Sequence, residues 1–187
     1  MKYPNNIIKS NQKNINYSNR GMSLEFDLNI TNDYYRDKNI AVIYKKPTPI
    51  RVVNVDFTNI KKPIINKAFF EKASTTDYNG IYKGKYVDFE AKEVKSKKSF
   101  CLSNIHKHQL EHLFKVKEHK GISFIIVRFI KFNKTFLLDS EILLKFINKG
   151  NKSISIDLFN EYGYQVNEGY RPRVDYIKVI DHIYFGG

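Results

Sequence analysis

Residues 122–130 form a nearly continuous apolar run, which limits the fold of this chain more than any other feature. A strand without alternation of apolar and polar side chains is typical of the centre of a sheet that is buried on both faces. Residues 104–119 before it have the apolar spacing of a helix, and Gly121 is a suitable stop for that helix. The run therefore predicts a buried central strand that follows a helix.

Other segments continue this mixture of helix and strand. A helix is predicted from Met22 to about Arg36, strands over residues 40–44, 50–55 and 135–138, and a short helix over residues 141–147. Residues 174–183 fit either element, and a helix is slightly favoured. The order predicts an α/β fold with a mixed central sheet flanked by helices.

The chain divides into a basic arm and a single predicted domain. Residues 1–18 contain lysine but no acidic residue, and their many polar residues predict a flexible arm. Residues 19–187 then form the domain, with residues 56–74 as a candidate insertion. That insertion places lysines among apolar and aromatic residues, which fits a projection that touches a ligand. An ordinary hairpin with its aromatic side chains packed on the core fits equally well.

The charge of the chain favours a polyanionic partner. Thirty-two Lys and Arg residues against nineteen Asp and Glu give a net charge of +13. Such a balance is typical of proteins that bind nucleic acid or an anionic membrane surface, although a merely soluble basic protein is the alternative. No run reaches the roughly 18 apolar residues that a membrane helix needs, so we expect no membrane partner. The single cysteine, Cys101, cannot form an internal disulfide, which fits a reducing cytoplasm.

Charged residues alternate with apolar ones near the middle of the chain. Val87, Phe89 and Ala91 are apolar, and the residues between them and after them are Asp88, Glu90 and Lys92. Because side chains of a strand point alternately to its two faces, the three charged side chains share one face. Such a row is costly unless it meets a ligand, a metal or solvent.

A turn at Lys83-Gly84 would fold the preceding residues back onto this strand. Pairing across that turn puts Asp77 opposite Glu90 and Thr75 opposite Lys92. Cross-strand partners share a face at about 5 Å between Cβ atoms, so one hydroxyl, two carboxylates and one ammonium would converge. A slip of one residue would send Asp77 to the other face.

Two alternatives stay open at this point. Asn79-Gly80 is a rival turn that would break the pairing, and the charged row can be a solvated ladder of ion pairs. Asp88 would pair with Asn79, nearer the turn, and ranks second to Glu90 as a metal ligand. If the groups do converge, hard oxygen ligands suit Mg²⁺, and a bound Mg²⁺ suits phosphodiester hydrolysis.

The residues Asp77 and Glu90-Ala91-Lys92 resemble the short PD-(D/E)xK pattern of nucleases. The longer context is more specific, and from about residue 15 to the end it resembles the RecU family of Holliday junction resolvases. The residues that carry this resemblance are Asn19-Arg20-Gly21-Met22 with Leu24-Glu25, Lys45-Lys46-Pro47-Thr48-Pro49, residues 74–80, residues 88–93, His108-Gln109 and residues 169–176.

The resemblance implies a restriction-endonuclease-like fold, a homodimer, and symmetric Mg²⁺-dependent nicking of four-way DNA junctions, with Mn²⁺ as a possible substitute. It implies that Thr75, Asp77, Glu90 and Gln109 surround the metal, and that Lys92 stabilises the transition state. Recombinase and branch-migration proteins become plausible partners. A zinc site at His108 and His112 is disfavoured, because the helix lacks the glutamate placement of a metalloprotease.

The resemblance also makes residues 56–74 the family's stalk, which reaches into the junction centre. An aromatic side chain there, Phe69 or Phe70, would wedge between unstacked bases, unless the core buries it. Any single lysine is more readily an ordinary surface charge than a phosphate contact. The candidate DNA contacts are Arg20, Lys45, Lys46, Lys61, Lys62, Phe70 and Lys85. The rival functions are a DNA-binding protein without catalysis and another nuclease of the same superfold that cuts duplex DNA.

Overall fold

The computed structural model describes residues 23–71 and 75–186, and its centre is a mixed sheet of six strands. Only the neighbours β5 and β7 run parallel, and the other neighbouring pairs are antiparallel. The predicted mixed central sheet is therefore confirmed. In the order in which they lie, the strands are β1 (Val42–Lys45), β4 (Tyr78–Tyr82), β5 (Lys85–Val94), β7 (Ile122–Phe129), β8 (Lys134–Asp139) and β10 (Tyr164–Val166).

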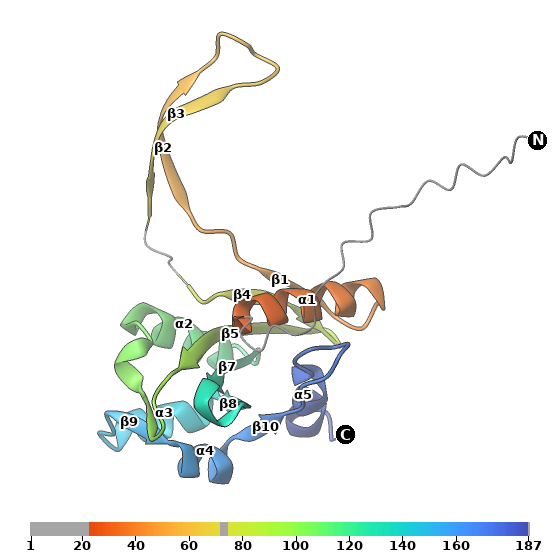
Figure 1. Ribbon diagram of the computed structural model, residues 1–187, viewed down its shortest axis with the longest axis vertical. Helices are drawn as coiled ribbons and strands as arrows, with labels where there is room; N and C mark the ends of the chain where they lie inside the picture. The colour runs from red at the N-terminus through yellow and green to blue at the C-terminus, as the bar shows by residue number, and fades with distance from the viewer. Residues whose placement is uncertain (1–22, 72–74, 187) are drawn as a thin grey trace, which may run out of the picture.

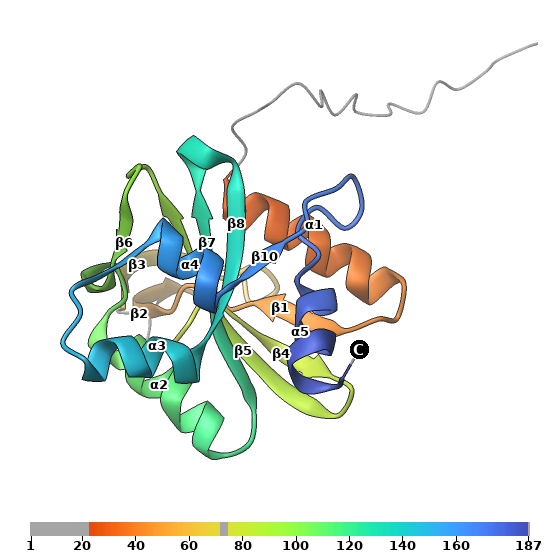
Figure 2. The same ribbon diagram turned by 90° about the horizontal axis from the view of Figure 1, so that it is seen from below.

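Helices cover both faces of this sheet, as Figure 2 shows. The first face packs against α1 (Leu24–Asp37) and α5 (Tyr176–Tyr184). The second face packs against α2 (Lys107–Glu118), α3 (Ser140–Asn148) and α4 (Ile156–Tyr162). A small two-stranded sheet, β6 (Ser99–Cys101) with β9 (Ser153–Ser155), and two short 3₁₀ turns, η1 (Leu102–Asn104) and η2 (Ile130–Phe132), complete the fold.

The strand that the apolar run predicted is the most enclosed element of the sheet. Every residue of β7 is buried, because helices lie on both sides of it. The alternation predicted for the neighbouring β5 is also confirmed. Val87, Phe89 and Ala91 pack in the cluster beneath α1 and α5, so the charged side chains of β5 point to the face that α2 covers.

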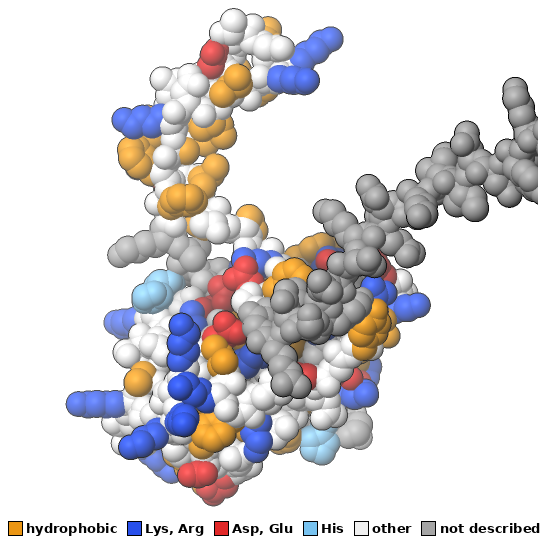
Figure 3. Space-filling view, viewed as in Figure 1, with side chains coloured by type: hydrophobic (Ala, Val, Ile, Leu, Met, Phe, Trp, Pro, Cys, Tyr) orange, Lys and Arg blue, Asp and Glu red, His pale blue; other side chains and the backbone are white. Residues whose placement is uncertain are grey.

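A long hairpin projects away from the sheet and its helices (Figure 1). It consists of β2 (Ile50–Asp56) and β3 (Ile64–Phe70), which among the described strands pair only with each other. The projection therefore begins at Ile50, earlier than the predicted residues 56–74. Phe70 is 84% exposed, so packing of these aromatic side chains on the core is wrong. Figure 3 shows hydrophobic side chains along the hairpin and Lys or Arg side chains at its far end.

The other predicted elements are present with shifted ends. The strand predicted over residues 40–44 is β1, and the favoured helix at residues 174–183 is α5. The elements that sequence reasoning missed are β6, β9, β10 and α4, which have three to seven residues, too few to show a period. The predicted arm at residues 1–18 lies outside the described residues. In the part of the chain that is described, no helix is long and apolar enough to cross a membrane.

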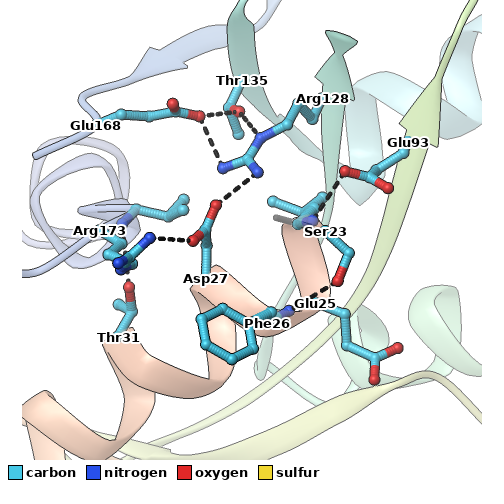
Figure 4. A network of polar contacts seen from close by, with 12 residues as sticks. Ser23, Glu25, Phe26, Asp27, Thr31, Glu93, Arg128, Thr135, Glu168 and Arg173 are labelled. Atoms are coloured by element: carbon cyan, nitrogen blue, oxygen red, sulfur yellow. Dashed lines mark hydrogen bonds and ion pairs between the residues drawn. The ribbon is translucent and has the colours of Figure 1, made fainter. Parts of the chain in front are cut away.

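A buried network of charges joins the first helix to the end of the chain (Figure 4). Asp27 of α1 accepts hydrogen bonds from Arg128 of β7 at 2.7 Å and from Arg173 at 2.9 Å. Arg128 also donates to Glu168 at 2.9 Å. Because buried charges are stable only when they are paired, this network fixes α1 against β7 and the segment before α5.

Candidate active site

The site is built on the β4–β5 hairpin. Lys83 and Gly84 form its two-residue turn, with φ of 45° and 75°. Two positive φ values are typical of the turn whose twist matches that of paired strands. The register pairs Tyr78 with Phe89 and Asn79 with Asp88, as the Lys83-Gly84 turn predicts. The rival turn at Asn79-Gly80 is therefore wrong, because those residues lie within β4.

Asp77 and Glu90 lie side by side at the start of this hairpin. The backbone N–H of Asp77 donates to Glu90 Oε2 at 3.1 Å, and the N–H of Ala91 donates to Asp77 Oδ2 at 3.1 Å. Lys92 Nζ donates to Glu90 Oε1. The predicted convergence of two carboxylates and one ammonium is present in the structure. The Glu90 side chain is fully buried, so the pair is not a solvated ladder of surface charges.

The environment of Glu90 opposes its ionised form. Burial, and next the charge of the neighbouring Asp77, raise the pKa of Glu90 from its ordinary 4.5 to about 7, although Lys92 acts in the opposite direction. A carboxylate in this state is ready to release its proton when a cation binds beside it. The donor chemistry therefore fits a hard divalent ion such as Mg²⁺.

Of two further predicted metal-shell residues, Gln109 contacts Glu90, whereas Thr75 contacts Lys46. The pairing of β4 with β5 ends at Tyr78, so the predicted pairing of Thr75 with Lys92 is wrong. Thr75 Oγ1 instead accepts from Lys46 Nζ at 3.2 Å.

Gln109, near the start of α2, contacts the carboxylate of Glu90 directly. Its Nε2 donates to Glu90 Oε1 at 2.8 Å, and its Oε1 accepts from the backbone N–H of His106 at 2.9 Å. An amide oxygen has two acceptor positions, so one remains for another partner. Within residues 23–71 and 75–186, no three His, Cys, Asp or Glu side chains are grouped to hold a metal, so a cation here needs oxygens of other kinds.

A second polar cluster, which sequence reasoning missed, surrounds the buried Asp88. The strand period places Asp88 on the face of Glu90, but its partners other than Tyr86 lie outside β5 and gave no local signal. The groups that contact its carboxylate are Lys46 Nζ, Thr76 Oγ1, Tyr86 OH and His112 Nε2. Lys46, predicted as a DNA contact, thus lies inside the site. Its ammonium contacts both Thr75 and Asp88, so Asp88 lies closer to Thr75 than the strand pairing suggested.

The remaining predicted DNA contacts lie at three places. Lys61 and Lys62 are exposed between β2 and β3, and Phe70 ends β3. Lys45 forms an ion pair with Glu25 of α1. Lys85 lines a surface cavity of about 440 Å³ together with Lys117, Lys120, Gly121, Ile122, Glu141, Tyr184 and Phe185. Arg20 lies outside the described residues.

Comparison with known proteins identifies relatives over most of the chain. The family model described as "Recombination protein U" (RecU) matches residues 19–182. The Holliday junction resolvase RecU of Geobacillus kaustophilus (strain HTA426) is 51% identical over 173 residues, which are 90% of this chain and 86% of that protein. The Holliday junction resolvase RecU of Bacillus cereus (strain B4264) is 50% identical over 173 residues, with the same coverage of 90% and 86%.

A solved structure of the Holliday junction resolvase Hjc from Archaeoglobus fulgidus is similar with a TM-score of 0.41 and 10% identity, over 71% of this chain and 93% of that one. The sequence comparisons carry the assignment. The family model covers residues 19–182, and two relatives are about half identical to this chain over nine-tenths of the chain's length. This chain therefore belongs to the RecU family.

Proposed function

We propose that this protein is a Mg²⁺-dependent endodeoxyribonuclease that resolves four-way DNA junctions in recombination and repair by paired, symmetric nicks. The observation that carries the proposal is the contact between Asp77, the buried Glu90 and Lys92. Membership of a family whose relatives are named Holliday junction resolvases supports the choice of substrate. Mn²⁺ has the same preference for oxygen ligands and is proposed as a substitute.

The carboxylates of Asp77 and Glu90 would hold the ion, with the Thr75 hydroxyl and the Gln109 amide oxygen as further ligands. A bound Mg²⁺ lowers the pKa of a bound water and offsets negative charge on the phosphate. Lys92 Nζ, held against Glu90, would donate to the phosphate oxygens as negative charge develops there. The hydrogen bond from Gln109 Nε2 keeps the Glu90 carboxylate in place for this work.

Selection of a junction over linear duplex is assigned to the β2–β3 hairpin. It extends away from the sheet (Figure 1), and Lys61 and Lys62 lie in the connection between β2 and β3. Lysine charges bind phosphate groups, and an exposed aromatic side chain such as Phe70 can stack on an unpaired base. The open centre of a four-way junction offers both phosphate groups and incompletely stacked bases.

Symmetric nicking requires two active sites related by a two-fold axis, and we assign the partner as a second copy of this chain. The face of β1, β4 and β5 that α2 leaves uncovered carries an exposed apolar row. Val42 pairs with Ile81, and Ile81 pairs with Tyr86, so these three side chains adjoin. The row includes β1, the strand that leads into the β2–β3 hairpin and its exposed apolar side chains, so one partner chain can cover both the row and the hairpin.

The cytoplasm is the proposed location, where recombinase and branch-migration proteins would meet the same DNA. These two partners remain predictions from the family resemblance.

Cleavage of a labelled synthetic four-way junction tests the proposed function, beside linear duplex of the same sequence. Wild type, Asp77→Asn and the exposed control Asp33→Asn would be compared in Mg²⁺ and in EDTA. We expect paired nicks at symmetric positions, on the junction alone, from wild type and the control in Mg²⁺. Tight junction binding without cutting would support a binding protein instead, and equal cutting of linear duplex would support another nuclease of this fold.

A further inference from the structure

Asp88 has the most complete set of hydrogen-bond partners of any carboxylate near the site, yet the proposed chemistry gives it no role. Its side chain is fully buried, two residues before Glu90 on the same face of β5. Lys46 Nζ lies 2.8 Å from it, Tyr86 OH 2.8 Å and His112 Nε2 3.0 Å, and Thr76 Oγ1 also donates to it. Removal of this carboxylate would take one acceptor from each of these four donors, of which Thr76 is buried.

Lys46 connects Asp88 to the catalytic Asp77 through two kinds of contact. Its backbone N–H donates to the carbonyl oxygen of Asp77 at 2.8 Å. Its ammonium donates to Asp88, to Thr75 Oγ1 at 3.2 Å and to Thr76 Oγ1 at 2.9 Å. An ammonium has three donors, so these three acceptors use all of them. Lys46 is therefore poorly placed to bind a DNA phosphate and well placed to hold the segment that carries Asp77.

The same contacts join the two ends of the projecting hairpin. Lys46 lies in the segment that leads from β1 into β2, and Thr75 and Thr76 lie between β3 and β4. At the hairpin base, the backbone N–H of Glu71 donates to the carbonyl oxygen of Pro49 at 3.0 Å. Asp88 thus binds the entering and the leaving segment at once, directly beside Glu90, and through His112 it also binds α2, the helix of Gln109.

We propose that Asp88 is a positioning residue that, through Lys46 and the Thr75-Thr76 pair, fixes the base of the β2–β3 hairpin to β5, the strand that carries Glu90 and Lys92. Any change in the hairpin when it engages DNA then reaches Asp77 through a short set of partly buried hydrogen bonds. The proposal rests on the proposed junction cleavage, because it assigns a role in placing Asp77 for that reaction.

The test compares Asp88→Asn and Lys46→Gln with the neighbouring Lys45→Gln. Lys45 is a matched comparison because it is the adjacent lysine and, among the described residues, its exposed ammonium pairs with the exposed Glu25 instead of Asp88. Three quantities are measured on the full chain. They are single-turnover cleavage of a four-way junction at saturating enzyme, the dissociation constant of that junction over a range of salt, and hydrogen exchange of the Asp77 and Lys46 amides without DNA.

For Asp88→Asn and Lys46→Gln we expect at least a ten-fold lower single-turnover rate, since a misplacement of about 1 Å can lower a rate about 100-fold. Their junction affinity and its salt dependence should stay within about two-fold, because neither side chain binds a phosphate in this proposal. Lys45→Gln should show the opposite effect on binding, which should become weaker and less salt-dependent. The double variant should be no slower than the slower single variant, because both substitutions break one network.

Hydrogen exchange makes the result independent of cleavage. We expect the Asp77 and Lys46 amides to exchange at least about ten-fold faster in both variants, while the amides of β7 keep their protection. Weakened binding with a normal rate in Lys46→Gln would make Lys46 a phosphate contact and overturn the proposal. Unchanged exchange at Asp77 would overturn it too, whether or not the wild type cuts junctions. If the wild type cuts nothing but exchange rises as expected, the proposed function fails while the positioning contact stands.

Discussion

Glu90 and Asp88 are fully buried carboxylates on the same face of one strand, and their neighbours separate their roles. Glu90 lies against a second carboxylate, Asp77, and its pKa is raised by burial and by that charge. Asp88 is enclosed by hydrogen-bond donors from four segments of the chain. The surroundings of Glu90 suit a carboxyl group that releases its proton when a cation binds. The surroundings of Asp88 suit a carboxylate that holds neighbouring segments in place.

The raised pKa of Glu90 predicts a stability that falls with pH in the absence of metal. Between about pH 4.5 and 7 the folded protein binds more protons at Glu90 than the unfolded chain, so the free energy of unfolding decreases as pH rises through this window. The loss should be on the order of 3 kcal/mol and level off above pH 7. Urea unfolding in EDTA at pH 5 and pH 8 measures it.

Glu90→Gln is the control for this pH dependence, because glutamine cannot ionise. The variant should lose the decrease between pH 5 and pH 8, and added Mg²⁺ should stabilise the wild type at pH 8 but not the variant. An equal pH dependence in both proteins would show that another group causes it.

Lys92→Gln should lower the single-turnover rate about 100- to 1,000-fold, as the loss of one preorganised donor does in other enzymes. Its junction affinity should change little, because the charge acts on the transition state rather than on the bound DNA. Lys149→Gln, which removes an exposed charge at the end of α3, should cut normally. A Lys92 variant with weak binding and a normal rate would instead place Lys92 among the DNA contacts.

At the scale of elements, the β4–β5 and β2–β3 hairpins differ in the contacts that stabilise them. The β4–β5 hairpin lies inside the sheet, between β1 and β7, and buries apolar residues against α1 and α5. In the described part of the chain, the two strands of the β2–β3 hairpin pair with no other strand, and they leave apolar side chains exposed along their length. An isolated two-stranded hairpin is marginally stable in water, so this element depends on its attached base and on what it binds.

The hairpin should set the preference for junctions over linear duplex. Replacement of Lys61 and Lys62 by glutamine should weaken junction binding and lower the salt slope by about 0.9 for each phosphate that is no longer neutralised. Phe70→Ser should weaken junction binding at unchanged salt slope, because it removes stacking rather than charge. Titrations of junction and of linear duplex measure both effects. Equal losses of affinity for the two DNAs would remove the hairpin from junction selection.

At the scale of the whole molecule, distant parts of the chain are joined at buried contacts. Asp27 near the start of α1 binds Arg128 of the central β7 and Arg173 of the segment before α5 (Figure 4). Glu93, at the end of β5, accepts from the first N–H of α1 at 2.8 Å. Helix α1 is therefore bound both to β5, the strand of Glu90, and to the segment before α5.

Asp27→Asn should destabilise the fold by about 3–5 kcal/mol, because it removes one charge of a buried network and leaves its arginine partners poorly compensated. Chemical unfolding measures the change. Asp33→Asn on the exposed side of the same helix is the control, and its effect should stay within about 0.5 kcal/mol. A small effect at Asp27 would show that water or another group replaces the contact.

Ile81→Glu tests the proposed second copy, because Ile81 is 57% exposed at the centre of the apolar row. A charge at that position should convert dimers to monomers without loss of folding, and the monomer should lose paired nicking. Analytical ultracentrifugation with circular dichroism separates these effects. The exposed Lys149→Gln should leave the mass unchanged. A variant that stays dimeric would place the interface elsewhere.

The sequence by itself determined the parts of the fold and site that depend on local periodicity. The apolar run of β7, the alternation of β5 and the turn at Lys83-Gly84 each lie within a few residues, and together they placed Asp77 beside Glu90 and Lys92. Regular backbone geometry converts such patterns into faces and partners, so no distant contact was needed.

Only the tertiary structure decided the contacts between segments that are remote in the chain. It brought Lys46 and His112 to Asp88, put Gln109 against Glu90, and placed Thr75 beside Lys46 instead of opposite Lys92. Such contacts follow from how elements pack and where a strand stops pairing. They leave no period in the sequence, because they depend on the whole set of buried surfaces rather than on any one segment.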